Sequence, residues 1–349
     1  MPRVAGVDPG SVTIDVCVLD DGRLVAERSW PTEHAVAEPA EVAAWLAEQR
    51  PALVAGPSGY GLPLVPADRA TDRDWRLAFL APPGEDGGIG GLRRLAGALV
   101  EASLPVVFLP GVVHLDTVPR HRKLNRVDLG TADKVCACAL AIAEQAHAAG
   151  LGAERVSLVL LELGGAFTAA LAVQDGRIVD GFGGTAGPPG WRSAGAWDGE
   201  VAFLAGQVTK AMLFVGGLET IVAQDAGLGP MALEAVMEGA VKAVRALQVA
   251  APRARRVVLS GRHAGDPGVA DALRERLGPD VVVTPLGGFA AVKHAAQGAA
   301  LLADGLAGGR HRDLVETMRI RYASGTVLDH LFSVPAAAVR RQLGLTFGA

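Results

Sequence analysis

The chain has 349 residues, of which 50% are hydrophobic and 20% are charged, so its length suits two globular domains that each bury a core. The formal net charge of −4 and the isoelectric point near 6.1 argue against a general nucleic-acid-binding protein. The three cysteines, Cys17, Cys136 and Cys138, are too few and too irregularly spaced for a disulfide framework or a zinc site.

The first pattern along the chain predicts a β-hairpin. Apolar residues lead to Asp8, a Pro-Gly-Ser turn follows, and alternating residues from Thr13 onward predict the return strand. Gly10 would let the backbone approach a ligand closely, and the amides of Gly10 and Ser11 would form an anion-binding nest beside the hydroxyls of Ser11 and Thr13. Asp8 would face a metal ion held by the same phosphates. The turn therefore predicts a phosphate site, and an ordinary tight turn with Asp8 as a turn former is the alternative.

The segment that follows predicts the alternating helices and strands of an α/β domain. A proline start and helical spacing predict a helix over 39–50, and an apolar run predicts a buried strand over 51–55. The glycine- and proline-rich run 56–63 is either a ligand-binding loop or a plain connection. Beyond it we expect an irregular excursion over 71–91, a helix over 91–102 and a strand over 104–109.

The most basic part of the sequence lies at 120–126, just before a glycine turn and a helix. Arg122, Lys123 and Arg126 in this segment are candidates for an anion site, because guanidinium and ammonium groups suit phosphate or carboxylate. A solvated basic face is the alternative.

The clearest helix in the sequence is predicted over 130–147, where Thr131 can act as the cap and alanines suit close packing. Asp133 lies in its first turn. The helix dipole favours an acid at that place, so Asp133 is either a structural residue or a functional carboxylate.

A second copy of the hairpin pattern opens the second half of the chain. A hydrophobic strand from Val156 leads to Glu162, the turn with Gly164 and Gly165 follows, and Thr168 begins the return strand. Two hairpins that each carry an acid and a glycine turn predict a duplicated domain. We expect Gly164, Gly165 and Thr168 to be further phosphate contacts.

The rest of the second half predicts a glycine-rich loop and then helices that alternate with strands. The run 181–200 contains two tryptophans and the acids Asp198 and Glu200, and is either a lid or substrate platform, or a structural Ω-loop. Beyond it we expect helices over 230–249, 266–277 and 290–306, strands over 257–260 and 281–284, and a mostly helical tail over 310–349.

These patterns resemble a known superfamily. The two hairpins are similar to the two phosphate motifs of the superfamily of acetate and sugar kinases, heat-shock chaperones and actin, and residues 257–262 are similar to its adenosine motif. Residues 122–134, 180–185 and 323–329 resemble an uncharacterised, mainly archaeal family of predicted butyrate kinases. The resemblance implies two duplicated ribonuclease H-like (actin-like ATPase) α/β domains with a nucleotide cleft between them. The implied boundaries are 1–150 and 151–309, with a tail at 310–349 that packs back on the first domain.

The resemblance also implies cofactors and residue roles. ATP and Mg²⁺ are the expected cofactors, with the metal ion near Asp8 and Glu162, the phosphates in the two glycine turns and the adenosine against Gly261. Asp133 matches the aspartate that acts as general base in type III pantothenate kinases, which implies that it accepts the proton of the acceptor. The basic candidates named above would neutralise the transferring group or an anionic acceptor.

The implied activity is ATP-dependent phosphoryl transfer to a small molecule, and a carboxylate such as butyrate is one possible acceptor. The acceptor class stays open, because a carboxylate needs no general base whereas a hydroxyl or amine does. The alternative function is a non-metabolic ATP-binding regulator or an actin-like conformational scaffold. The expected partner is the small-molecule acceptor, and no nucleic acid or membrane is expected. Whether the chain forms a homodimer is left open. The cytoplasm is the expected location, because neither a signal peptide nor a membrane-length apolar run is recognisable.

Overall fold

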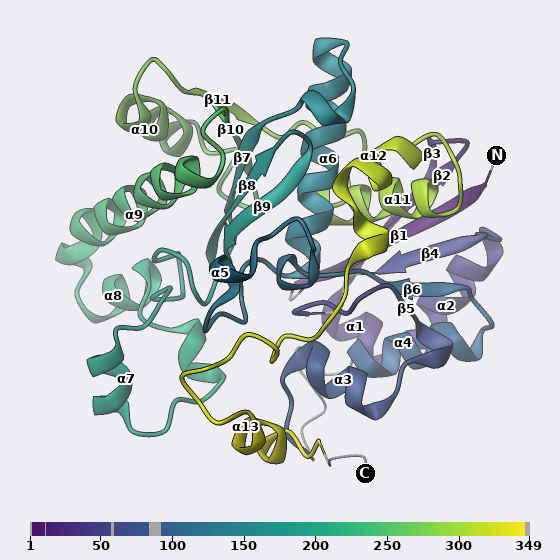
Figure 1. The fold of residues 1–349 in the computed structure, drawn as a ribbon, viewed down its shortest axis with the longest axis horizontal. Helices are drawn as coiled ribbons and strands as arrows, with labels where there is room; N and C mark the ends of the chain where they lie inside the picture. The colour runs from purple at the N-terminus through teal and green to yellow at the C-terminus, as the bar shows by residue number, and fades with distance from the viewer. Residues whose placement is uncertain (1, 11, 57–58, 84–91, 346–349) are drawn as a thin grey trace. The chain divides into compact units, whose positions relative to one another are not determined.

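The computed structural model describes residues 2–10, 12–56, 59–83 and 92–345, and it divides into two compact units (Figure 1). Unit 1 comprises Met1–Val127, Thr131–Ala153 and Gly288–Ala349, and unit 2 comprises Asp128–Gly130 and Glu154–Gly287. This division differs from the expected domains at the C-terminal side, because the helix predicted over 290–306 packs in unit 1.

The sheet of unit 1 is built on the predicted first hairpin. β1 (Arg3–Pro9) pairs antiparallel with β2 (Thr13–Asp20), which pairs antiparallel with β3 (Arg23–Pro31). On its other side β1 pairs in parallel with β4 (Leu53–Gly56), β4 pairs in parallel with β6 (Val106–Phe108), and β5 (Val65–Pro66) closes the sheet. The carboxyl ends of β1, β4 and β6 therefore share one edge, where ligands usually bind in open α/β sheets.

One helix packs closely on a face of this sheet, and a second helix packs against the first. α11 (His294–Leu306) contacts β1, β2 and β4 and packs against α6 (Ala132–Ala149). Glycines permit the close approach: a Cβ atom on Gly298 would lie 1.8 Å from the carbonyl oxygen of Cys136, and one on Gly6 would lie 2.1 Å from the amide nitrogen of Ala300. The other helices of unit 1 are α1 (Thr32–Ala37), α2 (Pro39–Glu48), α3 (Asp72–Phe79), α4 (Leu92–Glu101), α5 (Arg120–Lys123), α12 (Arg312–Met318) and α13 (Ala336–Gln342).

The predicted irregular excursion over 71–91 contains the helix α3, so that prediction was wrong. α3 begins with a capping box in which the amide of Asp74 donates to the hydroxyl of Thr71 and the amide of Thr71 donates to the carboxylate of Asp74. Trp75 stacks on Phe79 and packs edge-on against Phe108, which anchors the helix on the core. The high charge of the segment hid this apolar face. Residues 84–91 lie outside the described part of the chain.

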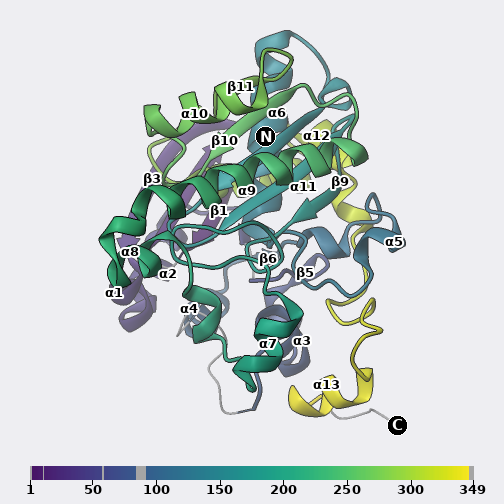
Figure 2. The same ribbon diagram turned by 90° about the vertical axis from the view of Figure 1, so that its left-hand side faces the viewer.

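The C-terminal tail packs within unit 1. The amides of Phe332 and Ser333 donate to the side-chain oxygen of Asn125, and the guanidinium group of Arg76 donates to the carbonyl of Leu343. Figures 1 and 2 show the yellow tail running from α12 to α13, which lies beside α3. The tail thus contributes to the stability of the unit that contains the first hairpin.

The sheet of unit 2 repeats the order of the sheet in unit 1. β7 (Leu158–Leu163), β8 (Thr168–Gln174) and β9 (Arg177–Phe182) form an antiparallel meander, and β10 (Arg256–Ser260) and β11 (Val282–Pro285) continue in parallel beside β7. The order β9-β8-β7-β10-β11 corresponds to β3-β2-β1-β4-β6, strand directions included. The shared topology confirms the predicted duplication.

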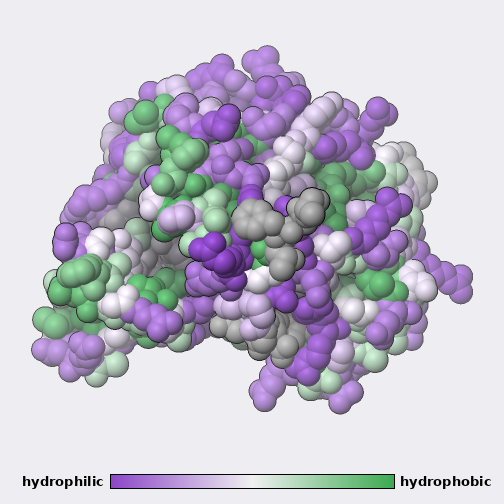
Figure 3. Space-filling model, turned by 60° about the horizontal axis from the view of Figure 1, so that its bottom comes forward, coloured by the Kyte–Doolittle hydropathy of each residue, from purple (hydrophilic) through white to green (hydrophobic). Residues whose placement is uncertain are grey.

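The helices of unit 2 are α7 (Gly199–Ala205), α8 (Leu218–Gln224), α9 (Gly229–Ala250) and α10 (Pro267–Leu277). α9 lies along the sheet and contacts β7, β8 and β9 (Figure 2). Large apolar side chains are exposed around α7 and α8, among them Phe203 and Leu204, which are 79% and 80% exposed. Figure 3 colours hydrophobic residues green on one face of the molecule. Among the described helices, none combines the length and apolar character needed to cross a bilayer.

Candidate active site

The first hairpin brings two buried carboxylates face to face. Asp8 and Asp15 are direct partners in the β1–β2 register, and the two residues are 6% and 4% exposed. Burial, followed by the charge of Asp133, raises the pKa of Asp8 to about 7, although Lys293 and Lys134 act in the opposite direction. Asp8 is therefore harder to ionise than an ordinary carboxyl group.

Lys293 supplies a cation to both carboxylates. Its Nζ atom lies 3.0 Å from the Oδ2 atom of Asp15 and 3.8 Å from the Oδ2 atom of Asp8. The same ammonium group donates to the carbonyl of Thr13 at 2.8 Å. A Cβ atom on Gly10 would lie 2.3 Å from this Nζ atom, so the glycine of the turn makes room for the lysine.

The backbone of the first turn is used differently from the prediction. The amide of Gly10 donates to the carbonyl oxygens of Asp8 and Thr13, both at 3.0 Å, and is not free to bind a phosphate. The hydroxyl of Thr13 donates to the Oδ2 atom of Asp15 at 2.6 Å. Ser11 lies outside the described residues. The turn thus presents the Lys293 ammonium group where a Gly10 amide was expected.

The start of α6 adds a third carboxylate to this cluster. Burial alone would raise the pKa of Asp133, but the charge and hydrogen bond of Lys134 and the hydroxyl of Thr131 outweigh burial and hold this pKa below its usual value. The Nζ atom of Lys134 and the Oγ1 atom of Thr131 each lie 2.5 Å from an oxygen of Asp133. Asp133 is therefore ionised and paired at neutral pH, whereas Asp8 is harder to ionise.

The donor set of this cluster suits a hydrated Mg²⁺ ion better than a fully coordinated one. Asp8, Asp15 and Asp133 offer the oxygen ligands that Mg²⁺ prefers. Among the described residues, however, no group of three His, Cys, Asp or Glu side chains is arranged to hold a metal ion directly. Mg²⁺ usually keeps several waters and binds through one or two carboxylates together with substrate phosphates, and the residues present fit that arrangement. Glu162, at the end of β7 opposite Ser260, stays a predicted contact of the ion.

The second predicted phosphate turn presents free backbone amides. The amide of Gly164 donates to the carbonyl of Phe167 at 3.0 Å, and a Cβ atom on Gly164 would lie 2.9 Å from that oxygen, so the turn requires a glycine. The amides of Gly165 and Ala166 donate no hydrogen bond to any residue in the described part of the chain. Free amides in a turn between two strands are a feature of anion sites. Gly164 and Gly165 stay predicted phosphate contacts.

Thr168 is unavailable to a ligand, contrary to the prediction. The residue is 0% exposed, and its hydroxyl has no hydrogen-bond partner among the described residues. The glycine-rich loop after β9 covers it: a Cβ atom on Gly190 would lie 2.9 Å from the Thr168 amide nitrogen, and one on Gly187 would lie 3.0 Å from the Thr168 carbonyl oxygen. The prediction failed because the covering loop comes from a later part of the chain.

The same glycine-rich loop is anchored on the second turn. The carbonyl oxygen of Ala166 accepts hydrogen bonds from the amides of Arg192 and Ser193, both at 3.0 Å. Trp191 is 8% exposed and stacks on the ring of His263, with 3.8 Å between ring centroids. These contacts favour the structural loop over the lid.

Gly261 follows the last residue of β10 and has a conformation that only glycine adopts easily. Its φ angle is +90°, and a Cβ atom would lie 2.5 Å from the carbonyl oxygen of Leu163. The chain therefore crosses the end of β7 at this glycine. The contact of Gly261 with an adenosine stays a prediction.

The basic segment is divided between inward and outward side chains. Lys123 is 6% exposed, and its Nζ atom donates to the carbonyl of Leu115 at 2.7 Å. Burial lowers the pKa of Lys123. Its predicted role as an anion-binding cation is wrong, because the ammonium group is turned into unit 1. Arg122 and Arg126 are half-buried and stay predicted contacts of an anion.

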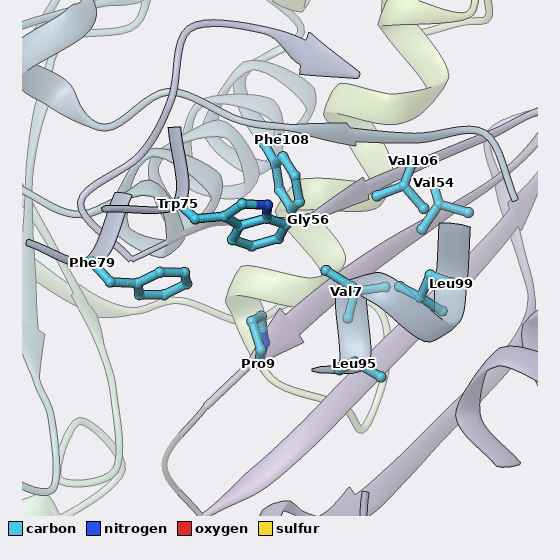
Figure 4. Close-up of a pocket in the computed structure, with 11 residues that line it drawn as sticks. Val7, Pro9, Val54, Gly56, Trp75, Phe79, Leu95, Leu99, Val106 and Phe108 are labelled. Carbon is cyan, nitrogen blue, oxygen red and sulfur yellow. The ribbon is translucent and has the colours of Figure 1, made fainter. Parts of the chain in front are cut away.

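An apolar pocket of about 40 Å³ lies in unit 1 (Figure 4). It is lined by valines of β1, β4 and β6, by leucines of α4, and by the rings of Trp75, Phe79 and Phe108. Pro9, Gly56 and Ala96 complete the lining, and a Cβ atom on Gly56 would meet no atom within 4 Å. The pocket lies at the strand ends beside the first turn, on the face of β1 opposite Asp8, because successive residues of a strand alternate between faces.

Sequence reasoning missed Asp15 and Lys293. Asp15 carried a usable signal, because the register of a tight hairpin places it opposite Asp8. Lys293 carried none, since 280 residues separate it from its partner Thr13.

Most of the chain matches the model of one protein family. The model of the family described as protein of unknown function DUF1464 matches residues 6–333. The chain belongs to this family. No curated protein matches the chain significantly.

The fold of this DUF1464 member is similar to that of carboxylate kinases. A propionate kinase from Francisella tularensis subsp. tularensis SCHU S4 is 12% identical over 86% of this chain and 98% of its own, with a TM-score of 0.58. An acetate kinase from Entamoeba histolytica is 12% identical over 79% of this chain and 86% of its own, with a TM-score of 0.57. An acetate kinase from Porphyromonas gingivalis is 13% identical over 86% of this chain and 98% of its own, with a TM-score of 0.56. The likeness confirms the predicted two-domain α/β fold of actin-like ATPases.

Proposed function

We propose that this DUF1464 member is an ATP-dependent phosphotransferase that acts on a small molecule. The observation that carries the proposal is the cluster at the first turn, in which the carboxylates of Asp8, Asp15 and Asp133 share the ammonium groups of Lys293 and Lys134. Burying Asp8 and Asp15 beside the half-buried Asp133 is costly, and a hairpin with only a structural role does not need this cluster. The fold shared with acetate and propionate kinases supports the same class of reaction.

In the proposed reaction the protein positions the reactants and neutralises charge. Lys293 would offset the negative charge of the phosphates at the first turn, and the amides of Gly165 and Ala166 would donate to phosphate oxygens at the second. Asp8 would orient the hydrated Mg²⁺ ion, which when bound offsets further phosphate charge. That the two turns hold a single ATP stays a prediction.

We propose a short-chain carboxylic acid as the acceptor. The pocket beside the first turn is lined by apolar and aromatic residues and by Gly56, and it suits an alkyl chain. Its volume of about 40 Å³ is well below the roughly 150 Å³ of a cavity that holds benzene, so a chain of a few carbons is the expected occupant. Asp133 supports the same acceptor, because its lowered pKa makes it a weak base. A carboxylate acceptor is already ionised and needs no general base. This is the butyrate-kinase-like form of the proposal.

The chemical step requires no proton transfer. An oxygen of the acceptor carboxylate would attack the γ-phosphorus of ATP, and the bond from this phosphorus to the oxygen shared with the β-phosphate would break. ADP would leave with that electron pair, and the other product would be an acyl phosphate.

A hydroxamate trap tests the proposal directly. The purified chain would be incubated with Mg-ATP, hydroxylamine, and acetate, propionate, butyrate or hexanoate. We expect ADP and the hydroxamate to form together, with Asp8→Asn reducing both at least about 100-fold. Asp313→Asn, a change at an exposed acid of unit 1, is the control and should leave both unchanged.

Other outcomes would change the conclusion. ATP binding without turnover on any acid, alcohol or amine would favour the regulator or scaffold. The absence of ATP binding by calorimetry would overturn the proposed function.

A further inference from the structure

Arg262, the residue after Gly261, reaches over the turn between β7 and β8. Its Nε, Cδ and Cζ atoms lie 3.6 to 3.7 Å from the position of a Cβ atom on Gly165. We infer that Arg262 binds the phosphate oxygens of a nucleotide at this turn. The inference rests on the proposed function and adds to it a phosphate-contacting side chain of unit 2.

The backbone around Arg262 is fixed on both sides. Before it, Gly261 packs against the carbonyl of Leu163; after it, the amide of His263 donates to that same carbonyl at 3.0 Å. The His263 ring lies parallel to Trp191, with an interplanar angle of 3°. These contacts fix the backbone position from which the Arg262 side chain extends over Gly165.

Arg262 has no acidic partner among the described residues, in contrast to three other arginines of unit 2. Its side chain is exposed and makes no hydrogen bond or ion pair with the residues that the structure describes. Arg253 pairs with Asp175, Arg274 with Asp271, and Arg276 with Glu234. The guanidinium group of Arg262 therefore remains available to an external anion.

The chemistry of the turn favours a phosphate chain. A guanidinium group presents N–H donors in a planar fork that matches two phosphate oxygens. The unused amides of Gly165 and Ala166 lie in the turn that this group contacts. Two backbone amides and a guanidinium group at one turn suit the oxygens of a phosphate group.

Calorimetry on the full chain tests the inference, with Mg-ATP, AMP and inorganic tripolyphosphate as separate ligands. We expect Arg262→Gln to weaken the binding of ATP and of tripolyphosphate by about 10- to 100-fold and to leave AMP binding unchanged. Arg262→Lys should recover part of the loss, because it keeps the charge without the fork. Arg255→Gln is the matched control, since Arg255 is an exposed arginine just before the opposite end of β10, and it should bind like the wild type.

The outcomes separate this inference from the proposed function. ATP affinity unchanged in Arg262→Gln would overturn the role of Arg262 and leave the proposed function standing. An equal loss of AMP and ATP affinity would assign Arg262 a structural role and overturn its phosphate contact. Binding of tripolyphosphate that depends on Arg262, without binding of ATP, would support the contact and overturn the proposed function. A wild-type chain that binds none of the three ligands would overturn both.

Discussion

Asp8 and Asp15 are direct partners across the β1–β2 hairpin, yet Lys293 lies closer to Asp15, at 3.0 Å against 3.8 Å. Burial, followed by the charge of Asp133, raises the pKa of Asp8 to about 7, and Lys293 and Lys134 oppose this shift only in part. The pair is therefore short of positive charge, and a hydrated divalent cation would supply it.

Removal of the Lys293 charge tests whether this cation stabilises the cluster. We expect Lys293→Met to lower the free energy of unfolding by about 1–3 kcal/mol, less than for a fully buried pair because the side chain is 39% exposed. Urea denaturation measures the change. Lys242→Met, which removes an exposed pair with Glu238, is the control and should leave the free energy of unfolding near the wild-type value. Adding Asp15→Asn to Lys293→Met should recover part of the loss, and no recovery would contradict the explanation.

Asp133 distinguishes the classes of acceptor. For a carboxylate acceptor we expect Asp133→Asn to lower turnover by less than about 10-fold and to leave ATP affinity near the wild-type value, because no proton has to be removed. Steady-state kinetics and calorimetry would measure the two quantities. A loss of about 100- to 10,000-fold in turnover alone would instead assign Asp133 as a general base and contradict the carboxylate proposal.

Gly56 provides a way to fill the pocket. A side chain there would enter open space, so we expect Gly56→Val to fold normally and to reduce activity on butyrate relative to acetate by about 10-fold or more. The reverse change, Leu99→Ala, should enlarge the pocket and shift the preference toward longer acids. Comparison of kcat/KM across a series of acids tests both. An identical chain-length profile in all three proteins would remove the pocket from the acceptor site.

The burial of His114 should make the stability of the protein depend on pH. The residue is 2% exposed, and burial, which outweighs all other influences, lowers its pKa to about 4 from 6.5. Lys123 adds to this shift, and Asp329 opposes it. Below pH 6.5 the unfolded chain binds a proton that the folded protein does not bind until about pH 4, so stability is lost as the pH falls through this window.

Over this pH window, the titration of His114 lowers the free energy of unfolding by about 3 kcal/mol in total. We expect His114→Gln to flatten the pH dependence of the free energy of unfolding between pH 6.5 and 4 relative to the wild type. Equal slopes for the variant and the wild type would show that His114 does not titrate in this way.

The sequence was most informative where the signal was local. Alternating apolar residues and turn glycines predicted both hairpins and their duplication, because register and turn chemistry lie within a few residues of each other. The contacts that shape the site are distant. Lys293 reaches the first turn from the far end of the chain, and the loop through Gly187 and Gly190 buries Thr168. The inward rotation of Lys123 depends on the Leu115 carbonyl, which no periodicity could indicate.

The buried cysteines allow the opening of unit 1 to be measured by thiol labelling. Cys17, Cys136 and Cys138 are all buried, all belong to unit 1, and burial raises the pKa of Cys17 to about 12. A thiol-reactive dye can therefore label the chain only when unit 1 opens, and the labelling rate follows the opening of this unit alone. If Mg-ATP binds at the first turn, saturating nucleotide should slow that labelling, which would follow occupancy of the site even in a variant without turnover.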